Sequence, residues 1–108
     1  MPSRPLSPRQ IELVADRFKA LAEPSRLRIL QALRTRERTV TELMAETGFG
    51  QANLSKHLQV LHAAGFLTRR KEGVSVYYAL ADPDVFALCD LVCGRIEREL
   101  AEQRRALR

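Results

Sequence analysis

The sequence is poor in cysteine and has no long apolar segment. None of its apolar runs approaches the ~20 residues that a membrane-spanning helix needs. The N-terminal stretch MPSRPLSPRQ lacks the apolar centre of a secretory signal peptide. The two cysteines do not have the spacing of a disulfide framework, which fits a reducing compartment better than an oxidising exterior. We therefore expect a cytoplasmic protein that does not associate with a membrane.

Recognisable catalytic motifs are also missing. The sequence has no glycine-rich phosphate-binding loop, no Cys-x-x-Cys pair and no ordered Ser, His and Asp set around a nucleophile elbow. These absences argue against an enzyme. Positive charge, in contrast, is in excess, because 18 lysines and arginines against 13 acidic residues give a formal net charge of +5. Such a chain favours a polyanionic partner.

The length of 108 residues predicts a single domain that spans 1–108. Its first helix is predicted at 7–21, because SPRQ combines an N-cap serine, a proline at N1 and a capping-box glutamine. Pro24 is expected to open a second helix. The apolar stripe predicted for that helix consists of Leu27, Ile29, Leu30 and Leu33.

The middle of the chain, 39–80, has the pattern of a helix-turn-helix followed by a hairpin. TVTE at 39–42 is a second capping box and predicts a short helix that ends near Gly48, and the next helix is expected to end at Gly65. Two stretches rich in β-branched and aromatic residues follow, with a turn expected at Glu72-Gly73. A last helix is predicted at 83–105. The chain is thus expected to be mainly α with a small β-hairpin, a winged helix-turn-helix in the order α-α-α-α-β-β-α.

The helix after the turn has two different faces. Leu54, Leu58 and Leu61 form its apolar face, and polar side chains suited to base edges or phosphates occupy the rest. A solvent-exposed face is the plain alternative, but the capped helix before it and the basic hairpin after it favour DNA. His57 is expected either to pack or to contact a phosphate. The residues of this helix predicted to contact DNA are Gln51, Ala52, Asn53, Ser55, Lys56, His57 and Gln59.

Three consecutive cations, Arg69, Arg70 and Lys71, lie beside the expected hairpin turn. Such a cluster can follow a phosphate backbone or enter a minor groove, although cations on a strand also discourage edge pairing. Strand alternation places Arg69 and Lys71 on one face and Arg70 on the other. We predict that Arg69 and Lys71 contact DNA.

Three stretches resemble the ArsR/SmtB family of bacterial winged-helix repressors: LAEPSRLRIL at 21–30, LSKHLQVLHAAGFL at 54–67 and VYYAL at 76–80. The resemblance extends over about residues 10–100. It implies a homodimer whose first and last helices form the interface. It also implies repression by operator binding and release by a small inducer.

The first and last helices independently indicate self-association. Each has an apolar stripe that the winged unit does not need, and two-fold pairing covers such stripes. A two-fold dimer is expected to bind a pseudo-palindromic site in double-stranded DNA. The residues predicted for the dimer interface are Ile11, Val14, Phe18, Val85, Leu88, Val92 and Ile96.

The metal sites common in this family are not matched. There is no cysteine between positions 40 and 47, and Phe86 stands where a histidine would be expected in the last helix. His57 and His62 lie about 140° apart around a helix and so do not face one metal. No resident metal or cofactor is therefore predicted with certainty.

The two cysteines, Cys89 and Cys93, lie four residues apart on one face of the last helix. Their Cβ atoms are expected ~5–6 Å apart, which is too far for an unstrained disulfide. They could instead chelate a thiophilic ion such as As(III), or be bridged by reactive sulfur. The alternative is that both are small apolar packing residues. The chain would then be a repressor of the same fold without cysteine sensing, and a winged-helix protein-interaction module is a further alternative.

Overall fold

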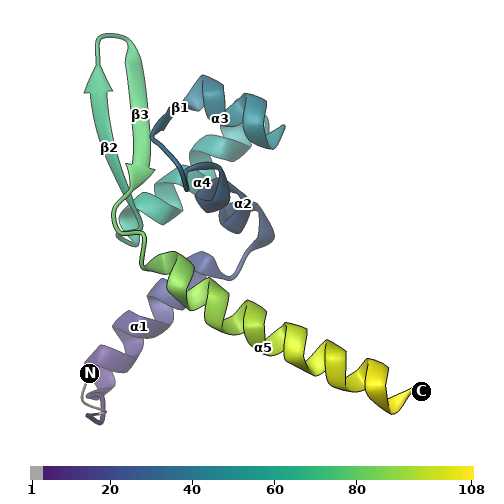
Figure 1. Cartoon of the computed structure of the whole chain (residues 1–108). Helices are drawn as coiled ribbons and strands as arrows, with labels where there is room; N and C mark the ends of the chain where they lie inside the picture. The colour runs from purple at the N-terminus through teal and green to yellow at the C-terminus, as the bar shows by residue number, and fades with distance from the viewer. Residues whose placement is uncertain (1–3) are drawn as a thin grey trace.

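Five helices and three short strands follow one another as α1-α2-β1-α3-α4-β2-β3-α5 in the computed structural model, which describes residues 4–108 (Figure 1). The predicted winged helix-turn-helix order is confirmed, and β1 is an addition to it. The elements are α1 Pro8–Leu21, α2 Pro24–Ala32, β1 Arg38–Thr39, α3 Val40–Thr47, α4 Gln51–Ala63, β2 Leu67–Glu72, β3 Ser75–Leu80 and α5 Val85–Ala106.

Local side-chain bonds start the helices where the sequence predicts. Ser7 and Gln10 form a reciprocal capping box at the start of α1, with N–O distances of 3.2 and 2.8 Å. Thr39 and Glu42 do the same at the start of α3, with distances of 3.2 and 3.0 Å. Each box gives hydrogen-bond acceptors to backbone N–H groups that have no partner within the helix.

A Schellman turn ends α4. Gly65 has a φ of +87°, the amide of Gly65 donates to the carbonyl of His62, and the amide of Phe66 donates to the carbonyl of Leu61, both at 3.0 Å. A residue with a Cβ atom would be strained at this φ, so glycine is favoured. The turn directs the chain from α4 straight into β2, which fixes the start of the hairpin.

The three strands form one antiparallel sheet in the order β1-β3-β2. Glu72 pairs with Ser75, so the two-residue hairpin loop is Gly73-Val74 and the predicted turn is wrong by one residue. Gly73 has a φ of +60° at the first position of this loop, where hairpin turns favour glycine. Arg38 and Thr39, for which no strand was predicted, form β1 opposite Tyr78 and Tyr77. We call the hairpin 67–80 the wing.

The core lies between α2, α3, α4 and the sheet, and the start of α5 closes it. Its buried side chains are Ile29, Leu30, Leu33, Leu43, Leu54, Leu58, Leu61, Leu67, Tyr78 and Val85. Two predictions are corrected here. Val85, predicted for the dimer interface, is 5% exposed and belongs to the core of the single chain. Leu27, predicted for the buried stripe of α2, is 41% exposed.

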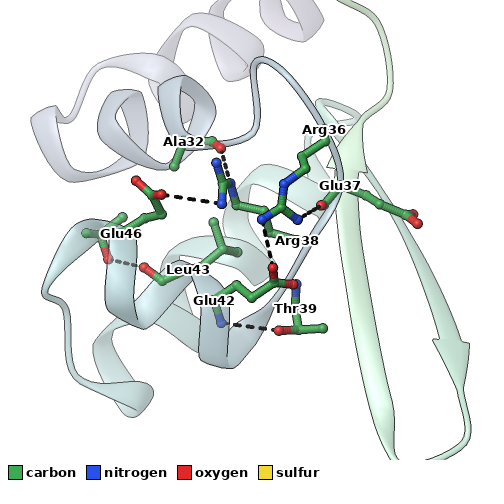
Figure 2. A network of polar contacts seen from close by, with 9 residues as sticks. Ala32, Arg36, Glu37, Arg38, Thr39, Glu42, Leu43 and Glu46 are labelled. Carbon is green, nitrogen blue, oxygen red and sulfur yellow. Dashed lines mark hydrogen bonds and ion pairs between the residues drawn. The ribbon is translucent and has the colours of Figure 1, made fainter.

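Three arginines bond to the carboxyl ends of three successive helices. Arg26 donates to the carbonyl of Ala20 in the last turn of α1 at 2.6 Å, and Arg28 donates to the last residue of α3 at 2.8 Å. Arg38 donates to the carbonyl of Ala32, the last residue of α2, at 2.6 Å and also pairs with a glutamate of α3 (Figure 2). These guanidinium groups satisfy free carbonyls and complement the negative end of each helix dipole.

The first and last helices extend away from this body in different directions (Figure 1). Only Val85 of α5 and Ala20 of α1 are fully buried, and most other side chains of these two helices are exposed. Among residues 4–108, no helix is both long and apolar enough to cross a bilayer. The two helices therefore present apolar side chains that the single chain does not cover.

Candidate nucleic-acid interface

The two faces predicted for α4 are present. Leu54, Leu58 and Leu61 are completely buried, so they hold the helix on the core. On the other side, five of the predicted contact residues are exposed and a sixth is half-buried. These six residues are Gln51, Ala52, Asn53, Lys56 and Gln59, with Ser55 half-buried.

A groove runs between the start of α4 and the wing. Gln51 and Ser55 of α4 line it together with Val76 of the wing and Thr41 at the start of α3. Gly50 begins α4 without a side-chain cap, so the first backbone N–H groups of the helix remain available to an anion. The groove thus combines side chains suited to base edges with backbone donors suited to phosphate.

The strand register places two wing cations beside this groove. Arg69 lies opposite Tyr78 and Lys71 lies opposite Val76, and both cations are exposed. Residues directly opposite in an antiparallel pair have side chains on the same face. Because Val76 lines the groove, Lys71 extends from the same face of the wing as the groove.

Arg70 lies on the other face of the wing and is bonded to acidic side chains. Its guanidinium donates to both carboxylate oxygens of Glu37, at 2.5 and 3.2 Å, and pairs with Glu72. It also lies 4.5 Å from the ring centroid of Tyr77. The hydrogen bond from Arg70 holds the pKa of Glu37 below its usual range. Arg70 thus lies on the opposite face of the strand from Arg69 and Lys71, as strand alternation predicts, and the DNA contacts of Arg69 and Lys71 stay a prediction.

His57 is a correction to the predicted contacts. Its side chain is buried, with Nδ1 3.3 Å from Glu23 Oε2 and 3.4 Å from Arg26 Nη1, and its ring packs near Phe49. This position does not fit direct contact with DNA. The sequence contained a signal for it, because His57 is three residues after Leu54 and so falls within the apolar arc of α4.

An apolar groove between α1, α2 and α5 contains most of the predicted dimer residues and both cysteines. Phe18, Leu88, Val92 and Ile96 line it, and the exposed Leu27 of α2 lies with them. Ile11 and Val14 are exposed further along α1. Leu27 was not predicted for the dimer interface, because its spacing within α2 matches that of the buried residues of the helix. The residues lining this groove are Phe18, Leu21, Ala22, Leu27, Leu88, Cys89, Val92, Cys93, Ile96 and Glu97.

Both cysteines are free thiols in this groove, Cys89 half-buried and Cys93 exposed. Cys93 Sγ donates to Glu97 Oε1 at 3.5 Å, and this hydrogen bond, followed by the negative charge of Glu97, raises the pKa of the Cys93 thiol. Arg95, two residues after Cys93, pairs with Glu99 at 2.9 Å. Within residues 4–108 no group of three or more His, Cys, Asp or Glu side chains is arranged to hold a metal ion.

The raised pKa predicts that Cys93 reacts slowly with alkylating agents at neutral pH. Only the thiolate is the nucleophile, so its rate should rise as pH increases toward the raised pKa. Replacing Glu97 by glutamine removes the negative charge, and we expect it to speed alkylation severalfold at pH 7. The rate of reaction with iodoacetamide, measured by mass spectrometry in a Cys89→Ser background, checks this. Glu102→Gln, on the same helix, is the matched control, and equal rates for Glu97→Gln and the parent would contradict the prediction.

Comparisons with known proteins agree with this geometry. A model of the bacterial regulatory protein arsR family matches residues 23–69. The HTH-type transcriptional regulator Rv0081 of Mycobacterium tuberculosis is 38% identical over 95% of this chain and 88% of its own. Its crystal structure has a TM-score of 0.78 at 36% identity, covering 91% of this chain and 98% of that one.

Two further relatives add detail. A homodimeric winged helix-turn-helix DNA-binding domain from Mycobacterium bovis, a possible ArsR-family regulator, has a TM-score of 0.75 at 34% identity, over 94% of this chain and 95% of that one. A probable mercury resistance operon repressor of Streptomyces lividans is 38% identical over 63% of this chain and 54% of its own length. The resemblance and the fold predicted from the sequence are both confirmed, and this chain belongs to the ArsR/SmtB family of DNA-binding transcriptional regulators.

Proposed function

We propose that this regulator represses transcription by binding a pseudo-palindromic operator as a homodimer, with α4 in the major groove. The observation that carries the proposal is the groove in which exposed polar residues of α4 lie beside the cationic face of the wing. A major groove admits one α-helix, and the buried leucines of α4 leave its polar face free to enter.

Within the proposed complex, base edges and phosphates are contacted by different elements. Gln51 and Asn53 can pair with adenine, Ser55 can contact base edges and the Ala52 methyl suits thymine. Arg69 and Lys71 extend from the groove side of the wing, where they can neutralise phosphates beside the major groove. The arrangement therefore supports sequence preference from α4 and affinity from the wing.

Dimerisation is supported by the uncovered apolar faces of α1 and α5. Phe18, Val92 and Ile96 are about half exposed or more in the single chain, which is unusual for side chains of this size. The M. bovis relative with the same fold is homodimeric. A two-fold axis through these faces would present two copies of α4 to successive half-sites, a helical turn or a multiple of it apart.

Replacing Gln51 by alanine tests the proposal. We expect the ratio of operator to random-sequence affinity to fall, by about five- to 100-fold for the loss of a bidentate base contact. The operator duplex is selected by the wild-type protein from a randomised pool, and affinity is measured by fluorescence anisotropy.

Lys71→Ala is the contrasting variant. It should weaken binding to both duplexes alike and make the salt dependence shallower by about one unit of slope, because one phosphate contact is lost. If the wild-type protein selects no sequence, the operator proposal is wrong and a protein-interaction role gains support. If it selects one but Gln51→Ala keeps the full ratio, Gln51 does not read bases.

A second proposal concerns release from DNA through Cys89 and Cys93. The two thiols lie on one face of α5 within the groove proposed for dimerisation, so a ligand held there would alter the dimer contact. Thiols suit a thiophilic ion such as As(III), or bridging by reactive sulfur. Among the described residues no group of three or more His, Cys, Asp or Glu side chains is arranged to hold a metal ion, so a further donor would come from the partner subunit or solvent.

We expect As(III) or a polysulfide donor to lower the operator affinity of the reduced protein by about tenfold or more, the size of a typical allosteric coupling. Both Cys89→Ser and Cys93→Ser should abolish that response while they bind DNA as tightly as wild type. Anisotropy titrations before and after each agent provide the measurement. An undiminished affinity would leave a repressor of the same fold in which these cysteines pack.

A further inference from the structure

The segment 36–38, which leads into β1 and includes its first residue, bonds to the helices on one side and to the wing on the other. Arg36 Nη2 lies 2.9 Å from Glu42 Oε2 on α3, and Arg38 donates to Ala32 at the end of α2. Figure 2 shows Glu37, between these two arginines, pointing away from them. Neighbouring residues of an extended segment place their side chains on opposite sides. This segment is therefore held firmly by the helices while Glu37 is directed at the wing.

The ion pair between Glu37 and Arg70 is bidentate, a geometry that can hold two exposed side chains in fixed positions. Two guanidinium nitrogens of Arg70 contact the two carboxylate oxygens of Glu37, and the two side chains are 50% and 41% exposed. Arg70 is further held by Glu72 and by the ring of Tyr77. Bidentate pairs within a network keep a fixed geometry that isolated surface pairs lack.

Near its tip, the wing has few other contacts with the helical part of the protein, α2 to α4. The two residues of β1 pair only with β3, at Tyr77 and Tyr78. On β2, the outer strand, Leu67 is the buried residue and the five that follow are exposed. Arg70 is in the middle of that exposed run, so its bond to Glu37 ties the outer strand to the body.

We propose that the Glu37–Arg70 pair is a brace that holds the wing at the angle needed for DNA binding. Arg70 is thus a positioning residue, whereas Lys71 on the opposite face contacts phosphate. This inference rests on the proposed function. The brace fixes the distance between the cations of the wing and the reading face of α4.

Replacing Glu37 by a neutral residue tests the role of the ion pair, because positioning and charge alone predict changes of opposite sign in DNA affinity. Removing a negative charge near a DNA-binding surface raises affinity if only charge matters. The brace predicts the opposite, and we expect Glu37→Gln to weaken binding to the selected operator duplex by about three- to tenfold, within the range for a lost positioning contact. Arg70→Ala should weaken binding to the same extent. Its slope of affinity against salt should stay close to wild type, because no phosphate contact is lost.

Glu72→Gln is the matched control, since it removes the same charge from the same arginine but bonds only within the wing. The Glu72→Gln variant should bind the operator as tightly as wild type or more tightly.

The double variant Glu37→Gln/Arg70→Ala should bind DNA no more weakly than either single variant. Amide hydrogen exchange in β2 should be faster in both single variants. Two results would overturn the brace and leave the proposed function intact. One is tighter DNA binding by Glu37→Gln. The other is a slope of affinity against salt that falls by about one unit in Arg70→Ala, as expected for Lys71→Ala.

Discussion

A Val92→Glu variant is expected to be monomeric and to bind operator DNA about 100-fold more weakly or worse. Val92 is 61% exposed in the single chain and lines the groove between α1, α2 and α5. A two-fold interface there would bury the introduced carboxylate without a partner, which costs far more than the lost apolar contact. A monomer binds one half-site at a time, so it loses the gain in affinity that a dimer obtains by binding two half-sites together. Analytical ultracentrifugation and anisotropy give the two readouts.

Leu107→Glu is the control for that variant. Leu107 is 88% exposed, follows the end of α5 and lies outside the groove, so the same new charge should leave dimerisation unchanged. Val92 does not belong to the core of the single chain, so the Val92→Glu variant should keep its helices. Circular dichroism checks this expectation. A dimeric Val92→Glu protein with full DNA affinity would exclude this groove as the interface.

Replacing Leu58 by alanine is expected to lower the free energy of unfolding by ~2–5 kcal/mol. Leu58 is completely buried and holds α4 against the core, so the substitution leaves a cavity behind the reading face. Domains of this size are stable by only ~5–15 kcal/mol in total. We therefore expect a large fall in the urea midpoint, measured at one fixed protein concentration because dimerisation adds to stability.

Leu107→Ala provides the reference for that substitution. It removes the same atoms from an exposed site, so the change in unfolding free energy should be below about 0.5 kcal/mol. Operator affinity, measured well below the unfolding midpoint, should change less for Leu58→Ala than for Gln51→Ala, because Leu58 does not face the groove. A stability loss of equal size in both leucine variants would show that Leu58 is not a core residue in solution.

Features that depend on neighbouring residues could be predicted from the sequence. The capping boxes at Ser7 and Thr39 act over three residues, and the Gly65 turn acts over five, so their patterns determine local structure. The polar and apolar faces of α4 follow from the helical repeat in the same way. The order of elements and the exposed contact residues of α4 follow from these local rules.

Features that depend on distant segments could not be predicted. The pairing of Arg38 with Tyr78 joins positions forty residues apart, and nothing near Arg38 indicates a strand. Val85 shares a helical face with Val92, but only the fold shows that the start of α5 lies against the core while the rest extends beyond it. The pairing of Arg70 with Glu37 likewise depends on how the wing folds back toward β1.

The arginines at the ends of α1, α2 and α3 have a consequence for how these helices can move. Arg26 and Arg28 both extend from α2, one to the end of α1 and the other to the end of α3, and Arg38 joins β1 to the end of α2. Because each bond connects two different elements, the first three helices are expected to move together as one rigid unit. A displacement of α1 at the apolar groove would therefore be passed on to α3 rather than absorbed between the helices.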